Sequence, residues 1–293
     1  ALFRSIHYAE QPSAPYSVLD YKHADITLIN NLQVTNNLVW AVKDFSPETH
    51  IVKLGTMGEY GTPNIDIEEG WLEINHKDRK DTFLYPRQAG SLYHTTKIMD
   101  TDLIWFGVRM WGLKVTDLMQ GPVYGSGTDE EKIDPRLKTI FNYDEIFGTV
   151  INRFVVQAAS GYPLTVYGKG GQTRGYINIK DVLQCVDASE KNPAKSGELV
   201  IYNQITETFS VNELAEKVQK VGGMLDIEVE IKNIENPRKE QEEHYYNPTY
   251  QGLKDIGLKP HYLTDEVLKG MYKEVIKHKD NIRKDVIFRG VKW

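Results

Sequence analysis

The sequence contains a single cysteine and no long run of hydrophobic residues. The one thiol, Cys185, excludes an internal disulfide framework and a thiolate-rich metal site, and the histidines His7, His244 and His261 are too scattered to predict a metal ion. No run approaches the ~18 apolar residues of a membrane span, and no signal peptide opens the chain. A net charge of -6 argues against nucleic-acid or membrane partners. We expect a cytoplasmic enzyme, or one of the plastid stroma if the chain comes from a plant.

The beginning of the chain also lacks a unit with which nucleotide-binding sheets usually start. Such a sheet begins with a strand, a glycine-rich turn and a helix, but here residues 6–10 already form a predicted strand and its exit loop. We infer that an amino-terminal portion is missing from this chain. The spacing Gly55-x-x-Gly58-x-x-Gly61 does not replace it, because residues 62–70 contain proline and acidic residues without a helical pattern. We predict a substrate-side loop there.

The most informative feature that is present is a tyrosine followed four residues later by a lysine. On a helix, Tyr93 and Lys97 lie one turn apart on the same face. A phenol titrates near ~10, and a neighbouring ammonium lowers that pKa. Thr56, at another strand end, can hold the substrate oxygen whose proton the phenolate takes. The set fits oxidation of an alcohol; the alternative is a surface tyrosine and a solvated lysine on an amphipathic helix.

The elements around these residues follow the order of a parallel α/β sheet. A strand at 50–54 runs into Thr56, a helix over 91–111 carries the tyrosine, and a strand at 114–118 ends near Gln120. Ligands of such sheets bind at the carboxyl ends of the strands, where Thr56 and Gln120 lie.

Hydrophobic spacing, turn residues and caps predict the remaining elements. Helices are expected at 16–45, 147–160, 180–189, 214–221 and 264–279, the fourth behind a capping box at Ser210 and Glu213. Strands are expected at 164–166, 198–202 and 227–231. The other segments are a short hairpin around 75–78, a charged excursion at 125–144 and a glycine-rich loop at 168–175.

Together these features resemble the extended short-chain dehydrogenase/reductase superfamily, whose members act on nucleotide sugars. The resemblance rests on Thr56, the Tyr93 and Lys97 pair, and the strings Gln120–Gly125, Leu164–Arg174 and Asn236–Arg238. Three longer segments are similar to sequences of the branch of this superfamily that adds sulfite to UDP-glucose. They are Leu54–Gly70, Arg174–Ile177 and Glu242–Asn247. The resemblance covers nearly the whole chain.

The resemblance implies a fold and a division of roles. The fold is α/β, with a Rossmann-type parallel sheet that lacks its amino-terminal glycine-rich unit and a smaller α+β carboxy-terminal substrate lobe. Residues 1–150 would form the partial NAD-binding domain with the Thr/Tyr/Lys site. Residues 151–293 would mainly bind the nucleotide sugar, with the chain crossing back to the sheet around 174–205. The helices at 16–45 and 91–111 would form a homodimer.

The resemblance also implies a reaction with NAD as cofactor. NAD oxidises UDP-glucose at C4, water leaves across C5 and C6, sulfite adds at C6, and C4 is reduced again to give a sulfonated UDP-sugar. Two alternatives stay open. One is a UDP-sugar 4-epimerase or dehydratase that uses no sulfite. The other is a catalytically silent nucleotide-sugar-binding protein.

Catalytic roles follow from the same resemblance. Tyr93 is the base at the C4 hydroxyl, Lys97 lowers its pKa and contacts the nicotinamide ribose, and Thr56 orients the C4 oxygen. Pro122 and Val123 flank the nicotinamide.

One departure from the superfamily concerns the loss of water. Met57 and Gly58 stand where its 4,6-dehydratases carry Asp-Glu, so another group must move the protons at C5 and C6. The candidates are His94, which titrates in the right range, Glu59 and Tyr60.

The nucleotide sugar is expected to be held by arginines. The guanidinium groups of Arg174 and Arg238 suit the diphosphate; the alternative is that they pair with surface glutamates. A second departure is Pro12, which stands where plant-like members carry an arginine, so the mode of sulfite binding stays open. The other predicted substrate contacts are Met57, Gln120, Asn152, Thr165 and Tyr167.

Overall fold

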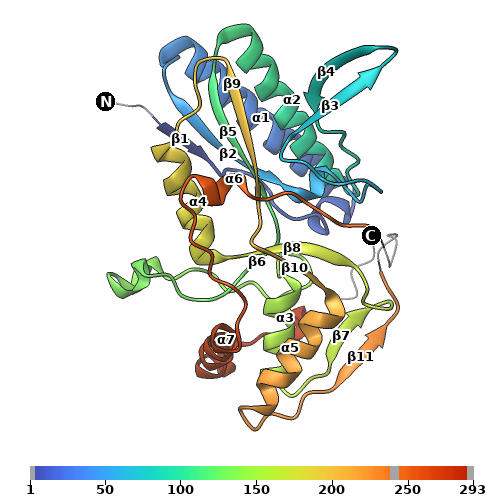
Figure 1. The fold of residues 1–293 in the computed structure, drawn as a ribbon. Coiled ribbons are helices and arrows are strands. Elements are labelled where there is room, and N and C mark those ends of the chain that lie inside the picture. Colours follow the sequence, from blue (N-terminus) through green and yellow to red (C-terminus); the bar gives the residue numbers. More distant parts are fainter. Residues whose placement is uncertain (1–3, 238–243, 289–293) are drawn as a thin grey trace. The chain divides into compact units, whose positions relative to one another are not determined.

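The computed structural model describes residues 4–237 and 244–288 of the 293-residue chain (Figure 1). Its contacts divide into two compact units, and each unit has its own hydrophobic core. The first consists of Ala1–Gly121, Leu183–Ile205 and Tyr245–Lys259, and the second of Pro122–Val182, Thr206–His244 and Pro260–Trp293. Within the described ranges, no helix is both long enough and apolar enough to cross a membrane.

The first unit is built on a four-stranded parallel sheet, which confirms the predicted α/β class. The strand order is β1-β2-β5-β9, formed by Arg4–His7, His50–Thr56, Lys114–Gln120 and Glu198–Gln204. Strand β2 is buried along nearly its whole length, as a central strand of a parallel sheet should be. The predicted strands at 50–54, 114–118 and 198–202 are confirmed, and each is longer than predicted at its carboxyl end. The strand predicted within residues 6–10 is confirmed as β1, which begins earlier, at Arg4, and ends at His7.

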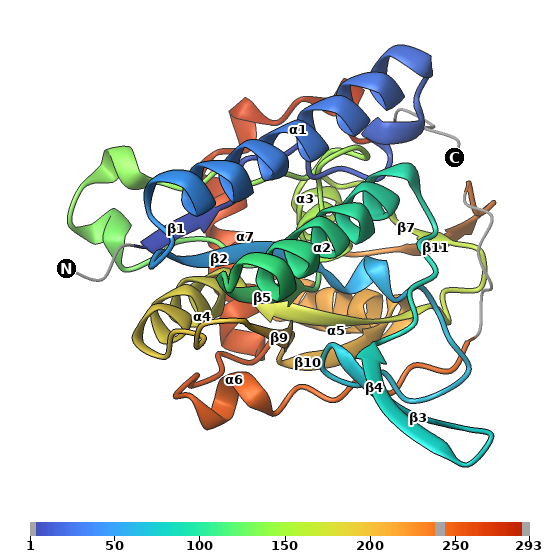
Figure 2. The ribbon, with the colours of Figure 1, turned by 90° about the horizontal axis from the view of Figure 1, so that it is seen from above.

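Two long helices cover one face of this sheet (Figure 2). Helix α1 (Tyr21–Phe45) packs against α2 (Leu92–Trp111), and α2 contacts β2, β5 and β9. The predicted start of the first helix at residue 16 is wrong. Residues Tyr16–Val18 form a separate 3-10 turn (η1), because Asp20 is extended and caps α1 by accepting a hydrogen bond from the backbone of His23.

The glycine-spaced loop after β2 contains no α-helix, which confirms that it is not a phosphate-binding turn. A short 3-10 turn, η2 (Met57–Glu59), follows the strand directly. Further on, β3 (Trp71–His76) and β4 (Arg79–Leu84) form an antiparallel hairpin. The predicted hairpin is therefore confirmed, and it is longer than expected. Helix α6 (Gly252–Asp255) contacts β9.

The second unit combines two small sheets with three packed helices. Strands β6 (Val123–Tyr124), β8 (Thr173–Asn178) and β10 (Glu207–Ser210) form one sheet, and β7 (Leu164–Tyr167) and β11 (Ile231–Ile234) form the other. Helices α3 (Val150–Ala159), α5 (Val211–Gly223) and α7 (Asp265–Lys277) pack on one another. The 3-10 turns of this unit are η3 (Glu130–Lys132), η4 (Pro135–Leu137), η5 (Lys279–Asn281) and η6 (Lys284–Val286). Helix α4 (Ile179–Lys191) is divided between the units, and its residues from Leu183 onward belong to the first.

Two predictions for this unit fail at element boundaries, and one is confirmed in detail. The strand expected at 227–231 begins only at Ile231, because the backbone turns back after α5, where Asp226 has a φ of 58° and the Ile227 N–H donates to the Gly222 carbonyl. The glycine-rich loop at 168–175 ends early, since β8 starts at residue 173. The capping box of Ser210 and Glu213 is present at the start of α5.

Candidate active site

Polar side chains meet at the carboxyl edge of the parallel sheet. In the strand register, Thr56 lies opposite Gln120, and Gln120 lies opposite Gln204. The Gln120 side chain donates to Gln204 Oε1 at 2.9 Å. Thr56 Oγ1 accepts the Gly58 backbone N–H at 3.2 Å, which leaves its hydroxyl proton for another acceptor. The predicted placement of Thr56 and Gln120 at neighbouring strand ends is confirmed, whereas Gln204 was missed.

Tyr93 and Lys97 lie one turn apart on α2, and both are buried against a carboxylate that the sequence analysis did not identify. The Tyr93 hydroxyl donates to Glu10 Oε1 at 3.3 Å. The Lys97 ammonium forms an ion pair with Glu10 Oε2 and a second with Asp100 at 3.4 Å. The side chains of Lys97 and Glu10 are 1% and 4% exposed, so the pair is nearly free of solvent screening.

Burial and the Glu10 carboxylate both act against ionisation of the Tyr93 phenol. Burial and the charge of Glu10 raise the pKa of Tyr93 well above its ordinary value. The Lys97 ammonium is itself paired with Glu10 and Asp100, and the role expected for it in lowering the pKa of Tyr93 remains a prediction. Burial also raises the pKa of Glu10, and Lys97 opposes that rise.

His94 is packed next to Tyr93 and over Gly58. The rings of Tyr93 and His94 are 5.1 Å apart between centroids. A Cβ atom added to Gly58 would lie 2.3 Å from His94 Nε2, closer than such atoms approach in proteins. Gly58 stands where the dehydratase pattern has an acid. Because it has no side chain, it leaves room for the imidazole of His94, so the residue types at positions 58 and 94 depend on each other.

This packing predicts the effect of filling the space at residue 58. In Gly58→Ala, the new methyl group should push the imidazole of His94 aside, and turnover should fall by about ten- to a hundredfold, as expected when a reacting group is misplaced. The matched control is Gly90→Ala, since no atom lies within 4 Å of a Cβ at that position. Steady-state rates and melting curves of both variants provide the measurement. Equal rates in the two variants would contradict the proposed packing role.

Glu59 and Tyr60, two further candidates for proton transfer, are buried. Glu59 lies in a network around Lys53 of β2: the ammonium is 3.0 Å from Asp117 Oδ2, 2.8 Å from Thr101 Oγ1 and 3.7 Å from Glu59 Oε1. Burial alone would lower the pKa of Lys53, but Asp117 and Glu59 raise it. Lys53, Asp117 and Glu59 are fully buried, and so is Tyr60, which packs edge-on against Tyr85.

His7 lies close to the same lysines and gives the fold a pH dependence. It is buried at the end of β1, 3.0 Å from Thr35 Oγ1, and burial with the charges of Lys97 and Lys53 lowers its pKa from 6.5 to about 4. Between these two values the unfolded chain binds a proton that the folded chain does not, so stability falls as the pH falls through this window. Above it, the contribution of His7 is constant.

Because of His7, we expect the free energy of unfolding to fall by about 2 kcal/mol between about pH 7 and about pH 5. Urea unfolding at the two pH values measures this loss. In His7→Gln the loss should be about 2 kcal/mol smaller than in the wild type. His76→Gln, at the exposed turn of the β3–β4 hairpin, is the control and should keep the wild-type pH dependence. An identical loss in His7→Gln would rule out this origin.

The predicted nucleotide-sugar contacts of the second unit lie on α3, β7 and β8. Asn152 donates to the Asn142 carbonyl at 3.2 Å, and its buried Oδ1 has no hydrogen-bond partner in the part of the chain that the structure describes. Thr165 exchanges hydrogen bonds with Gln157. Arg174 donates to the Thr173 carbonyl at 2.8 Å. Arg238 lies outside the described residues.

Tyr167 is paired with an arginine that sequence reasoning missed. The Arg153 guanidinium lies 4.7 Å above the Tyr167 ring and donates to its hydroxyl at 3.3 Å. The signal in the sequence was the only charged residue of α3, buried in a mostly apolar helix. Of the residues expected at the nicotinamide, Val123 pairs with Ile177 in the sheet, and the Pro122 carbonyl accepts the N–H of Ile177 at 3.2 Å. The roles proposed for all these side chains remain predictions.

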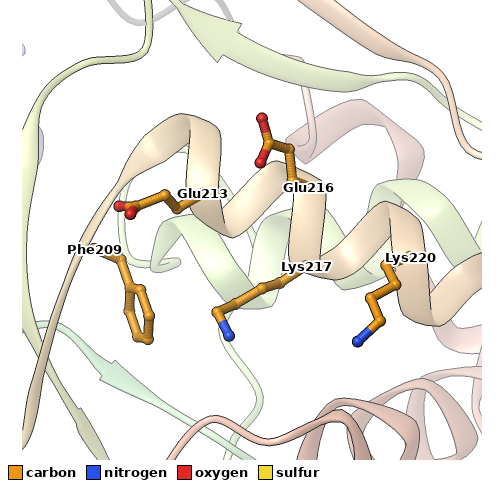
Figure 3. Close-up of a pocket in the computed structure, with 5 residues that line it drawn as sticks. All are labelled: Phe209, Glu213, Glu216, Lys217 and Lys220. Atoms are coloured by element: carbon orange, nitrogen blue, oxygen red, sulfur yellow. The ribbon is translucent and has the colours of Figure 1, made fainter.

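A shallow surface hollow lies on α5 and the adjoining end of β10, where Phe209 pairs with Arg174 of β8 in the strand register (Figure 3). It is lined by Phe209, Glu213, Glu216, Lys217 and Lys220. Lys217 lies 5.2 Å from the centre of the Phe209 ring, and Lys220 forms an ion pair with Asp265 at 2.7 Å. Because these cations already have partners, the hollow is not a strong candidate for an anion site.

Comparison with known proteins gives consistent family matches. Residues 6–203 match the NAD dependent epimerase/dehydratase family. The chain is 51% identical over 288 residues to the chloroplastic UDP-sulfoquinovose synthase of Spinacia oleracea, with 98% of this chain and 60% of that protein covered. It is 47% identical over 291 residues to the UDP-sulfoquinovose synthase of Sulfolobus acidocaldarius, again with 98% of this chain covered and 74% of the relative. The chain thus spans less than two thirds of the spinach protein.

Solved structures with the same fold have lower sequence identity. The UDP-glucuronic acid 4-epimerase of Bacillus cereus, in complex with UDP-glucuronic acid and NAD, superimposes with a TM-score of 0.69 at 18% identity and covers 94% of this chain and 76% of its own. MoeE5 in complex with UDP-glucose and NAD gives a TM-score of 0.68 at 16% identity, with 95% and 80% covered. These similarities establish the fold alone.

Proposed function

The chain belongs to the NAD dependent epimerase/dehydratase family, and from this premise we propose that it converts UDP-glucose and sulfite to UDP-sulfoquinovose and water. The observation that carries the proposal is the pair Tyr93 and Lys97 on α2 together with Thr56 at the carboxyl end of β2. The two UDP-sulfoquinovose synthases with about half of their aligned residues identical support the choice of reaction.

NAD is the cofactor we propose, and the donor set of the first unit fits it. A buried ammonium and a phenol hydroxyl one helical turn apart, those of Lys97 and Tyr93, are suited to the hydroxyl groups of the nicotinamide ribose. Pro122 and Val123 are the residues that would flank the nicotinamide ring. When bound, NAD supplies a reversible acceptor for the hydride at C4 of the sugar.

The side chains of the first unit account for the proton transfers. The Thr56 hydroxyl donates a hydrogen bond to the C4 oxygen and so orients it. Tyr93 takes the proton of the C4 hydroxyl. The C4 ketone acidifies the C5 proton, which His94 removes as general base. Met57 and Gln120 are proposed to contact the sugar. Glu59 remains a candidate for the proton transfer at the C6 hydroxyl. Its carboxylate lies 3.7 Å from the Lys53 ammonium and accepts a hydrogen bond from Thr101.

The nucleotide portion of the substrate is proposed to bind the second unit. The buried Oδ1 of Asn152 has no hydrogen-bond partner among the described residues, and a donor on the ligand would satisfy it. The aromatic ring of Tyr167, next to the Arg153 guanidinium, suits a base ring, and Arg174 suits the diphosphate. Thr165 and Arg238 complete the set of proposed contacts.

We further propose a homodimer through α1 and α2. These helices expose large apolar side chains to solvent, among them Ile29, Trp40, Phe45, Met99, Phe106 and Met110. Sedimentation velocity should give twice the chain mass for the wild type and the chain mass for Met110→Glu. Met224→Glu, on an exposed apolar residue outside these helices, is the control. A monomeric wild type would refute the dimer.

The reaction is tested by its product. The complete protein, incubated with UDP-glucose and NAD, should form a sulfonated UDP-hexose by mass spectrometry only when sulfite is present. If UDP-galactose or a 4-keto-6-deoxy sugar forms whether or not sulfite is present, the result would favour a UDP-sugar 4-epimerase or dehydratase. Substrate binding without any cofactor reduction would favour a nucleotide-sugar-binding protein.

A further inference from the structure

Lys53 is a buried cation behind the loop that carries Thr56, and the proposed chemistry does not use it. It lies on β2, three residues before Thr56, and its side chain is fully buried. Its ammonium donates to Thr101 Oγ1 at 2.8 Å and to Asp117 Oδ2 at 3.0 Å, and it lies 3.7 Å from Glu59 Oε1. A charge in the core is costly unless partners surround it, and here the partners come from α2, β5 and the η2 turn.

The hydroxyl of Thr101 on α2 connects these groups. Its oxygen accepts a hydrogen bond from the Lys53 ammonium, and its proton can be donated to Glu59 Oε2 at 3.2 Å or to Asp117 Oδ2 at 3.0 Å. A threonine has one hydroxyl proton, so it serves one carboxylate at a time. The other oxygen of Glu59 has no hydrogen-bond partner among the described residues. Because the ammonium already donates to Asp117, the Thr101 proton is the hydrogen bond that the buried Glu59 carboxylate needs.

Glu59 also connects the η2 turn to the segment that leads into α2. Its backbone carbonyl accepts the Gln88 N–H at 3.1 Å, and its Oε2 lies 3.6 Å from the guanidinium of Arg87. Arg87 forms a second ion pair with Asp102 of α2. The carboxylate at the end of η2 therefore has neighbours on β2, on α2 and on the segment before α2.

Two glycines show how closely the loop around Thr56 is packed. A Cβ atom added to Gly55 would lie 2.3 Å from Asp117 Oδ1. One added to Gly58 would lie 2.3 Å from His94 Nε2. The Gly58 N–H donates to Thr56 Oγ1, so a movement of the turn would also move the threonine. The loop is therefore packed against β5 on one side of Thr56 and against α2 on the other.

We propose that Lys53, Thr101 and Glu59 form a positioning network, which fixes the η2 turn against α2 and thereby sets where Thr56 lies relative to Tyr93. The inference rests on the proposed function, in which the hydroxyls of Thr56 and Tyr93 both contact the C4 oxygen of the sugar. A displacement of about 1 Å between reacting groups can cost about a hundredfold in rate. Lys53 and Thr101 are both buried, so they act through the turn and not on the substrate.

Amide hydrogen exchange of Thr101→Val, measured without substrate, tests the network directly. Valine has nearly the shape of threonine but no hydroxyl, so Glu59 loses its hydrogen bond and the η2 turn should open more often. We expect the amides of residues 55–62 to exchange about tenfold faster than in the wild type. Unchanged exchange in these residues would overturn the proposal.

Two matched variants control this measurement. Thr101→Ser keeps the hydroxyl and should keep the wild-type exchange of residues 55–62. Thr82→Val makes the same change as Thr101→Val at an exposed position of β4, and it should also leave these residues unaffected. Faster exchange of residues 55–62 in Thr82→Val or Thr101→Ser would overturn the assignment to the Thr101 hydroxyl.

The single-turnover rate of NAD reduction by UDP-glucose measures the consequence for the site. Thr101→Val should lower this rate about ten- to a hundredfold, because the reacting groups are misplaced. The UDP-glucose concentration for half of the maximal rate should change less than about threefold, since the binding contacts remain. Thr101→Ser should restore the wild-type rate. A wild-type rate in Thr101→Val would overturn the link between the network and the site.

Arg87→Met provides a second test, which does not depend on the folding of Thr101→Val. Arg87 has two carboxylate partners, the buried Glu59 and the 56% exposed Asp102, and only Glu59 belongs to the network. Arg87→Met should slow NAD reduction about threefold or more. Asp102→Asn alters the exposed partner alone and should keep the wild-type rate. A wild-type rate in Arg87→Met, or equal slowing by both variants, would overturn the proposal.

These outcomes separate the inference from the proposed function. If the wild type forms no sulfonated product while residues 55–62 exchange faster in Thr101→Val, the reaction is refuted and the network is retained. If the wild type forms the product and the exchange is unchanged, the reaction is retained and the network is refuted.

Discussion

Tyr93→Phe is expected to reduce turnover of UDP-glucose by about a thousandfold or more while leaving the fold intact. The phenol hydroxyl is the only group removed. In the proposed function its oxygen receives the C4 proton, so the loss should reach the range of general-base catalysis. The ring itself stays in place in a buried site, where Tyr93 is 6% exposed. Loss of one hydrogen bond to Glu10 should cost the fold about 1 kcal/mol.

The measurement is the initial rate of product formation together with a thermal melt. Tyr21→Phe provides the matched control, because that tyrosine is 84% exposed at the start of α1 and loses the same hydroxyl. The control should keep the wild-type rate. A Tyr93→Phe enzyme with wild-type turnover would remove Tyr93 from the mechanism.

Lys53→Met is expected to have the largest effect on stability. It replaces a fully buried ammonium by a side chain of similar length. Asp117 is then buried without the cation at 3.0 Å, and Glu59 keeps only Arg87, at 3.6 Å. Breaking one side of such a buried network typically costs ~3–5 kcal/mol of unfolding free energy. For a domain of ordinary stability this is a large fraction of the total.

Urea unfolding of Lys53→Met against the wild type measures this cost. Lys80→Met on the β3–β4 hairpin is the control, since its ion pair with Glu73 is exposed and should be worth less than about 1 kcal/mol. Adding Asp117→Leu to Lys53→Met should recover part of the loss, because the unpaired charge is then removed as well. Equal stabilities of the two lysine variants would show that the network is dispensable.

The sequence predicted those parts of the site that depend on periodicity and element ends. Thr56 and Gln120 could be placed side by side because consecutive strands of a parallel sheet end at the same edge. Tyr93 and Lys97 could be placed on one helix face because the helical repeat determines it.

The partners of these residues could not be predicted in the same way. Glu10 reaches Lys97 across 87 positions, and Lys53 reaches Asp117 across 64, so only the folded sheet brings them together. The signal that existed was a lysine in the middle of an apolar strand, which must have a partner when buried. Gly58 likewise gave no hint of His94, since the contact is a matter of available space.

The first unit is not contiguous in the chain, and this affects how the protein can fold as it is made. Its sheet is complete only after β9, which ends at Gln204, has emerged, long after β5. Until then one edge of β5 has no partner strand, so its backbone can pair with strands of other chains and its apolar side chains are exposed. A fragment that stops at Gly121 should therefore aggregate, and chaperone binding during synthesis should concentrate between the emergence of β5 and that of β9.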